Sequence, residues 1–245
     1  MTDRLVYLDN AAATRMDERV VQAMLPFMTD KYAVATSQFG YSLGLESKEA
    51  LDRARASLAG HIGASPEEFV FTSGDAESSN MAIKGVAAAL AEKKGRHIIS
   101  TAIEDFPVLH SVRSLERQGY SVDTVRVDEH GRVDLDHLES LLRPDTILVS
   151  IQAANQEIGT LQDLDAIGAL TREHGALLHS DATHTFGRVP LDVRHTPVDL
   201  LTVSSHVLHG PKGVGGLYIR KGTPITKWMD GGFQENNLRG GVENI

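Results

Sequence analysis

The 245-residue chain contains no cysteine. This absence excludes disulfide bonds, thiolate metal sites and any nucleophilic thiol supplied by the chain itself. Aromatic residues make up only 5% of the sequence, and no apolar run approaches the roughly 20 residues that a membrane-spanning helix needs. We therefore expect no membrane association. Because residues 1–6 also lack the apolar core of a signal peptide, we expect a cytoplasmic location.

Positive charge is also scarce. The sequence has 24 Lys and Arg residues against 33 Asp and Glu residues, which gives a formal net charge of -9. Nucleic-acid binding needs concentrated basic residues, so we expect no nucleic-acid partner. The 41% of hydrophobic residues is enough for a folded core. No repeat, linker or low-complexity tract divides the chain, and we predict a single domain over residues 1–245.

Apolar patterning predicts strands that alternate with helices. Short buried-type runs are followed by segments of 10 to 20 residues with apolar positions at helical spacing. This alternation is typical of right-handed crossovers and of a mainly parallel sheet covered on both faces. The predicted strands are 68–72, 97–100, 121–127, 146–151, 176–180, 198–203 and 215–220, and the predicted helices are 17–29, 45–62, 76–91, 107–118, 135–142 and 164–174.

The last two predicted strands are joined differently. The turn at residues 210–213 (GPKG) is too short for a crossover helix, so we predict an antiparallel or irregular final pairing. Residues 32–44 are rich in Gly, Ser and Thr and are predicted to form a loop. The predicted fold class is α/β, with three α/β/α layers around a mixed, mainly parallel sheet.

Polar residues follow five of the predicted strands. In open α/β sheets, ligands bind outside the carboxyl ends of the strands. The turn at Gly74 also leaves helix N-terminal N–H groups free, which favours an anion such as phosphate. We therefore predict a site built from five loops: residues 73–76, 102–105, 153–157, 181–184 and 204–207.

The same loops carry a family resemblance. The stretches LDNAAAT (8–14), FTSGDAESSN (71–80), ANQEIGT (154–160), HSDATH (179–184), LTVSSHVLHGPKGVGGLYIR (201–220) and GFQENNLRGGVEN (232–244) occur in the family's order. The chain resembles the NifS/IscS-like cysteine desulfurases, which are class V aminotransferases. The resemblance implies the large domain of fold-type I pyridoxal phosphate enzymes. We expect the family's small C-terminal domain, with its catalytic cysteine, to be absent from this chain.

Four positions of the resemblance keep the family's side chains. Asp181 stands where a carboxylate would pair with the pyridine nitrogen, and Asn155 where an amide would reach the phenolic oxygen. Ser204 and His206 stand where the phosphate would be held, next to the turn at Gly74. The resemblance therefore implies a cofactor-binding role for these positions.

Other positions depart from the family. Val207 stands in place of the Schiff-base lysine, and Asp105 in place of the ring-stacking histidine. Ala76 replaces a phosphate-binding threonine, His184 a glutamine near the phenolic oxygen, and Val242 a threonine that the partner subunit contributes. Asp75 adds a negative charge beside the expected phosphate, although it is also an ordinary residue for a helix start.

These departures bear directly on cofactor binding. A lost hydrogen bond to a charged phosphate costs about 1.5–3 kcal/mol, and covalent attachment starts from the missing lysine. No residue of the chain is therefore assigned a catalytic role. We expect no covalently bound cofactor, and pyridoxal phosphate is disfavoured. Lys212, in the GPKG turn, is a weak substitute because the family has that turn beside its true lysine.

The leading hypothesis is a catalytically degenerate cysteine desulfurase homologue. Such a pseudoenzyme would serve as a partner or scaffold in sulfur transfer or iron–sulfur cluster assembly. It would form a homodimer, or a heterodimer with a true cysteine desulfurase or with a chain that supplies the small domain. The first alternative is an active pyridoxal phosphate-dependent desulfurase or lyase completed by a partner chain.

A second alternative is a sensor that uses the vacated pocket for a small molecule or a metal. Asp105, Asp181, His184 and His206 are residue types that bind zinc or iron. A cofactor-sized pocket would hold them too far apart for metal bonds of about 2 Å. We therefore assign no metal ligands.

Overall fold

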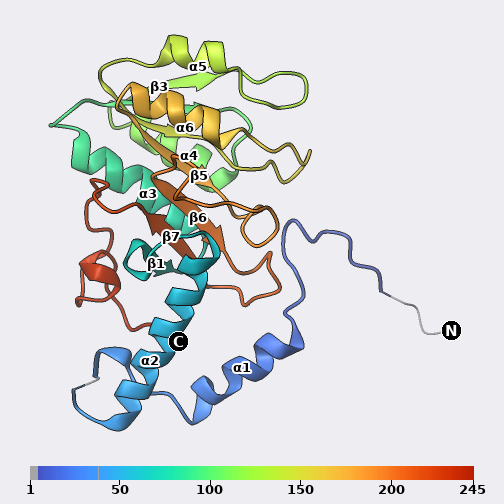
Figure 1. Ribbon diagram of the computed structural model, residues 1–245, viewed down its shortest axis with the longest axis vertical. Helices are drawn as coiled ribbons and strands as arrows, with labels where there is room; N and C mark the ends of the chain where they lie inside the picture. Colours follow the sequence, from blue (N-terminus) through green and yellow to red (C-terminus); the bar gives the residue numbers. More distant parts are fainter. Residues whose placement is uncertain (1–4, 38) are drawn as a thin grey trace.

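The computed structural model describes residues 5–37 and 39–245, which include a seven-stranded sheet (Figure 1). The strand order is β1-β7-β6-β5-β4-β2-β3. Strands β2 to β6 all run parallel to one another, whereas β7 is antiparallel to both β6 and β1. The bounds are β1 Phe69–Thr72, β2 His97–Thr101, β3 Ser121–Val125, β4 Thr146–Ser150, β5 Leu177–Asp181, β6 Leu200–Ser204 and β7 Gly215–Ile219.

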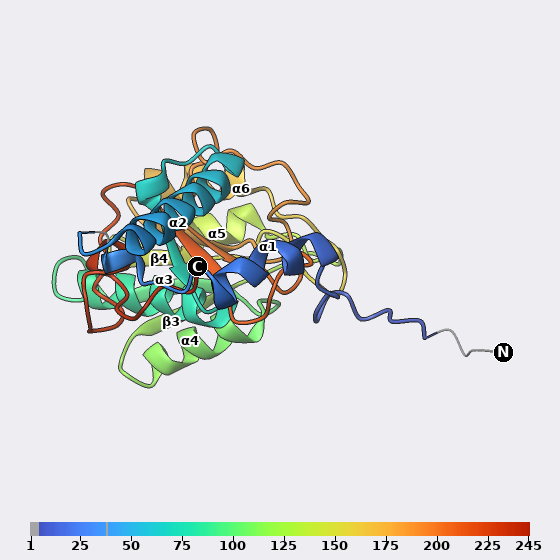
Figure 2. The same cartoon turned by 90° about the horizontal axis from the view of Figure 1, so that it is seen from below.

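Helices cover both faces of the sheet (Figure 2). One core cluster joins α2, α5 and α6 to the sheet, and a second cluster joins α3 and α4 to the opposite face. The bounds are α1 Glu18–Thr29, α2 Ser42–His61, α3 Asp75–Leu90, α4 Phe106–Glu116, α5 Leu135–Leu141 and α6 Leu164–Glu173. The predicted three-layer α/β/α fold class and the antiparallel final pairing are confirmed.

Aspartate side chains begin several of the helices. Asp105, Asp134 and Asp163 accept hydrogen bonds from backbone N–H groups in the first turns of α4, α5 and α6. These bonds satisfy donors that have no partner inside the helix. The first residues of these helices therefore lie close to where the sequence predicted them.

The segment predicted as a loop over residues 32–44 is more ordered than expected. It contains a short 3-10 turn, Ala35–Ser37, and α2 already begins at Ser42; residue 38 of this segment lies outside the described residues. The early start is supported by tertiary packing, because Gly44 and Ser47 are buried. Leu45, the first residue of the predicted helix, is exposed.

Two glycines of β7 permit close approaches beneath the site. A Cβ atom on Gly216 would lie 2.3 Å from the Phe69 ring, and one on Gly215 would lie 2.5 Å from Cα of Gly74. Contacts this short would displace the Phe69 ring and the backbone of the Gly74 turn, respectively. Gly215 therefore allows the Gly74 turn to lie directly against the end of β7, and Gly216 leaves room for the Phe69 ring.

A polar network crosses the centre of the sheet. The buried His179 ring on β5 bonds Ser150 Oγ of β4 at 2.8 Å and Thr202 Oγ1 of β6 at 3.0 Å. Ser79 of α3 extends the network to Thr202 at 3.1 Å. Because burial lowers the pKa of His179 to about 3, the ring is neutral in the folded protein.

A buried ion pair attaches the C-terminal segment to the sheet. Arg55 of α2 donates to Glu235 from Nη1 and Nη2, at 2.6 and 2.7 Å, and Glu235 also accepts the Phe71 N–H at 2.7 Å. Arg55 in turn donates to the Phe69 carbonyl oxygen at 2.7 Å. One carboxylate thus connects α2, β1 and the segment that follows β7.

Replacing Glu235 with glutamine would leave the Arg55 charge buried and unpaired. We expect Glu235→Gln to lower the free energy of unfolding by about 3 kcal/mol, the cost of breaking a buried pair. Urea unfolding monitored by circular dichroism measures this change. The matched control Asp230→Asn, at an exposed carboxylate, should change stability by less than about 0.5 kcal/mol; equal effects would contradict the assignment.

Protonation of His179 links stability to pH. The pKa of this histidine is depressed in the folded state, so its contribution is present above pH 6.5 and is lost as the pH falls. Below pH 6.5, we expect this residue to lower the free energy of unfolding by about 1.4 kcal/mol for each pH unit. The variant His179→Gln should lack this pH dependence. Urea unfolding between pH 7 and pH 5 tests this. An equally flattened profile for His110→Gln, at an exposed position, would argue against a specific role of His179.

Candidate cofactor-type site

The turn between β1 and α3 lies against the end of β6. Gly74 precedes α3 with φ of 143°, a conformation that favours glycine, and its N-cap position has no side-chain hydrogen bond. A Cβ atom on Gly74 would lie 3.5 Å from Ser204 Oγ. Ala76, in the first turn of α3, offers no polar side chain to this region. The structure thus brings the predicted phosphate-side loops together.

Asp75 occupies the side of this turn that faces His206. Its Oδ1 atom lies 3.9 Å from His206 Nδ1, and the same ring nitrogen is 2.7 Å from Ser204 Oγ. The Asp75 side chain is 21% exposed and the His206 side chain 25%. A carboxylate therefore stands beside the serine and histidine to which the resemblance assigns a phosphate.

Asp181 ends β5 at the bottom of the site. Its Oδ1 atom accepts the Thr183 N–H at 2.9 Å, but its Oδ2 atom is buried and has no hydrogen-bond partner among the described residues. Burial, with a smaller contribution from the charges of Asp75 and Asp105, raises the pKa of Asp181 to about 7. Asp181 thus presents a buried acceptor that the protein itself leaves unused.

His184 and Asp105 face the same region from two further loops. Burial lowers the pKa of His184, and the charges of Asp105 and Asp75 oppose that effect. The Asp105 carboxylate caps α4 by accepting the Phe106 N–H at 2.7 Å. Since the pKa values of both His184 and Asp181 respond to Asp75 and Asp105, four of the predicted site residues share one electrostatic environment.

Asn155, after β4, is held by backbone contacts. Its Nδ2 group donates to the Ile103 carbonyl oxygen at 3.0 Å, and its Oδ1 atom accepts the N–H groups of Glu157 and Ile158 at 2.9 and 3.0 Å. The side chain therefore joins the β4 loop to the β2 loop. One Nδ2 hydrogen remains for any ligand.

Val207, which the resemblance assigns to the position of the family's lysine, is fully buried. Its carbonyl oxygen accepts a hydrogen bond from the Arg188 guanidinium. The flanking loop is fastened to the N-terminal segment: both the N–H and the hydroxyl of Thr14 donate to the His206 carbonyl oxygen at 2.8 Å, and the His209 N–H donates to Thr14 Oγ1 at 2.7 Å. These bonds fix the loop without any ligand.

Sequence reasoning missed Glu104, which is buried beside Asp105. Its Oε1 atom accepts bonds from Thr101 Oγ1 at 2.6 Å and from the Gln152 N–H at 3.1 Å, whereas Oε2 is buried without a partner among the described residues. Burial raises the pKa of Glu104 to about 8, so the carboxyl is largely protonated near neutral pH. No sequence pattern distinguished Glu104 from its neighbour.

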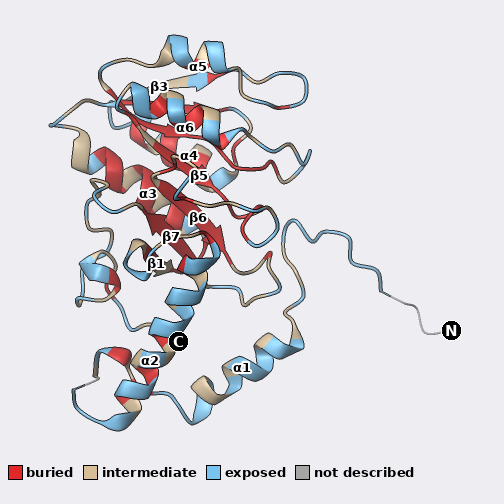
Figure 3. Ribbon diagram, viewed as in Figure 1, coloured by how far each residue is buried: buried red, intermediate tan, exposed pale blue. Residues whose placement is uncertain are grey.

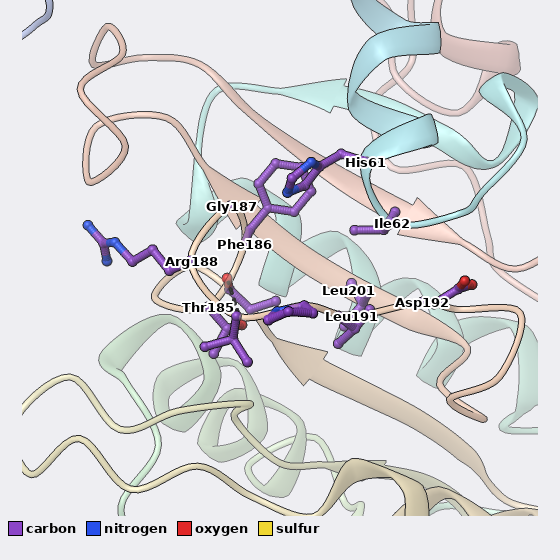
Figure 4. Close-up of a pocket in the computed structure, with 12 residues that line it drawn as sticks. His61, Ile62, Thr185, Phe186, Gly187, Arg188, Leu191, Asp192 and Leu201 are labelled. Atoms are coloured by element: carbon purple, nitrogen blue, oxygen red, sulfur yellow. Dashed lines mark hydrogen bonds between the residues drawn. The ribbon is translucent and has the colours of Figure 1, made fainter.

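Several hollows lie near these loops. An apolar hollow of about 470 Å³ is bounded by residues that include His61, Phe186, Arg188 and Leu201 (Figure 4), and Ala182 is the one residue of the five predicted loops that lines it. A second hollow, of about 380 Å³, is lined by Ile103, Glu104, Asp105, Phe106, Asn155, Gln156, Glu157 and Ile158. This second hollow belongs to the predicted site.

These residues fit pyridoxal phosphate only at one end. The free Oδ2 atom of Asp181 suits a pyridinium N–H. At the other end, Val207 carries no amine, and Asp75 brings a carboxylate to the phosphate side, where two like charges about 4 Å apart repel by several kcal/mol at an effective dielectric near 20. The anchor and the phosphate end therefore do not fit the cofactor.

A metal ion receives no support either. Among residues 5–37 and 39–245, no three His, Asp or Glu side chains converge closely enough to hold one. The candidate ligands Asp105, Asp181, His184 and His206 face a common region but are spread around it.

Comparison with known proteins identifies the relatives of this chain. The family described as Aminotransferase class-V matches residues 6–240. The chain is 46% identical over 242 residues to the cysteine desulfurase IscS of Dictyoglomus turgidum and 45% identical over 243 residues to that of Methanosarcina thermophila. These alignments cover 99% of this chain but 61% and 59% of the two relatives. The chain thus spans about 60% of their length.

Solved structures give the same result. A NifS-like protein superposes with a TM-score of 0.94 at 41% identity, covering 98% of this chain and 65% of that protein. DndA from Streptomyces lividans superposes with a TM-score of 0.84 at 38% identity, covering 97% and 67% of the two chains. With the family matched along nearly the whole sequence, this chain belongs to the class-V aminotransferase family of fold-type I pyridoxal phosphate proteins.

Proposed function

We propose that this chain is a non-catalytic member of the cysteine desulfurase branch that acts as a partner subunit. The observation that carries the proposal is Val207, a fully buried residue at the position that the resemblance assigns to the Schiff-base lysine. A valine cannot form the imine through which pyridoxal phosphate is anchored and activated. Pyridoxal phosphate chemistry, when the cofactor is present, would have to use groups from another chain.

Further substitutions support the same conclusion. The chain supplies no cysteine that could carry sulfur. Asp105 caps α4 where a ring-stacking histidine is expected, and Ala76 removes a hydroxyl from the phosphate side. These changes affect anchoring, stacking and phosphate binding separately, so no single compensating change would restore the site.

An exposed apolar stripe on α1 supports subunit pairing. Val21, Leu25 and Met28 recur at i, i+4 and i+7 and are 37%, 43% and 64% exposed, and α1 has no buried residue. The helix extends away from the sheet and carries little buried surface (Figure 3). Burying such a stripe against another surface is favourable by about 25 cal/mol for each Å² of apolar area.

The proposed partners follow from these features. They are a second copy of the chain, a true cysteine desulfurase, or a chain that supplies the part of the relatives that this sequence does not span. The proposed process is sulfur transfer or iron–sulfur cluster assembly, in the cytoplasm. No helix among the described residues is long and apolar enough to cross a membrane.

The retained Oδ2 acceptor of Asp181 favours one alternative, an active enzyme that binds pyridoxal phosphate with help from a partner. An absorption spectrum separates the two. After incubation with pyridoxal phosphate and removal of excess, we expect no stoichiometric aldimine band and no lysine labelled on borohydride reduction, whereas an IscS-type desulfurase treated identically shows both. A stoichiometric label on one lysine, such as Lys212, would refute the proposal.

A charged substitution in the apolar stripe of α1 tests subunit pairing. We expect the wild-type chain to form a dimer, or a complex with a co-expressed cysteine desulfurase, and Leu25→Glu to weaken that complex at least tenfold because it would bury a carboxylate. The control Gln22→Glu places the same charge at another exposed position of α1 and should pair normally. Light scattering coupled to size exclusion measures both; a wild-type monomer that captures no desulfurase contradicts pairing.

A further inference from the structure

The loops at the carboxyl ends of the strands carry an excess of negative charge. Asp75, Asp105 and Asp181 contribute three carboxyl groups to one electrostatic environment. His184 does not balance them, because burial lowers its pKa and favours the neutral ring. The nearby Arg188 is exposed to solvent and donates to the carbonyl oxygens of His184 and Val207.

A buried acceptor without a donor faces this charge. Asp181 is only 5% exposed, and its Oδ2 atom has no hydrogen-bond partner among the described residues. A buried acceptor that stays unpaired costs about 1–3 kcal/mol. A ligand carrying an N–H donor and a positive charge would satisfy this atom and offset the carboxylates together.

The adjoining hollow suits an organic body rather than a metal ion. It measures about 380 Å³ and is lined by Asp105 and Glu104 together with the apolar side chains of Phe106 and Ile158. Phe106 is 71% exposed and Ile158 60%, so both offer apolar surface to a ligand. An aromatic face also attracts cations. Within the described residues, no three ligands converge on a metal position.

We propose that this cleft binds a small organic cation, an aromatic or heteroaromatic ammonium compound, in place of an anionic phosphate cofactor. The ammonium or ring N–H group contacts Asp181 and is flanked by Asp75 and Asp105, while the ring lies along the hollow beside Phe106. The proposal rests on the proposed function in one respect, the lack of covalent anchoring at Val207. It does not depend on subunit pairing.

A pair of probes that differ only in a phosphate group tests the preference. Pyridoxamine carries a net positive charge near neutral pH, whereas pyridoxamine 5′-phosphate is anionic. Neither bears an aldehyde, so neither can form an imine with a lysine. By isothermal titration calorimetry at low ionic strength, we expect the wild-type chain to bind pyridoxamine at least tenfold more tightly than its phosphate ester.

Two variants test which carboxylates cause the preference for pyridoxamine over its phosphate ester. Asp75→Asn removes the charge beside His206 and should weaken pyridoxamine about tenfold while strengthening the phosphate ester. Asp105→Asn should also weaken pyridoxamine, and it preserves folding because asparagine caps helices as well as aspartate does. The control Asp136→Asn changes an exposed carboxylate on α5, away from the site, and should leave both affinities unchanged. Thermal unfolding verifies that each variant is folded.

Several outcomes would overturn the proposal. The first is that the wild-type chain binds the phosphate ester more tightly than pyridoxamine. The second is that neither probe binds detectably at millimolar concentration, and the third is that Asp136→Asn loses as much affinity as the site variants. Each leaves the proposed function standing, because that function is tested by aldimine formation and by pairing. Conversely, an aldimine formed with pyridoxal phosphate would refute the proposed function without deciding which pyridoxamine probe binds more tightly.

Discussion

Parallel pairing of β2, β4, β5 and β6 is the constraint on which the rest of this structure depends. Parallel strands must each return by a crossover, so their carboxyl ends meet at one edge and both faces are covered by helices. The loops after these strands are therefore brought together whatever residues they contain. Asp105, Asn155, Asp181 and His206 lie in one region for this reason, even though as many as 101 positions separate them along the chain.

Much of this arrangement could be predicted from the sequence, because hydrophobic period and helix caps are local signals. The runs 146–150 and 200–204 are buried throughout, and aspartate caps mark several helix starts. Tertiary effects were harder to predict. The early start of α2 depends on the burial of Gly44 and Ser47. The helix propensity of this segment is weak and does not indicate a helix there. Similarly, Glu104 is protonated only because the surrounding packing excludes water.

The candidate site separates two properties that usually occur together. Its shape depends on backbone contacts: Asn155 holds two loops, and the Gly74 turn fits against β7. Its charge depends on a few side chains, chiefly Asp75, Asp105 and Asp181. Under the proposals made above, Asp75 changes the electrostatic preference of the cleft and Val207 removes its anchor, while the sheet and loops stay in place. Resemblance in fold is for this reason a weaker guide to chemistry here than the identity of individual side chains.

The bonds from Thr14 to the loop of His206 and His209 have a broader consequence. In a site whose loops are ordered by their ligand, losing the ligand also loosens the protein, and the two properties must be retained or lost together. Here the chain supplies the ordering contacts itself. Under the proposed function, the loss of cofactor binding would therefore leave the fold of this loop in place, because the bonds from Thr14 hold it.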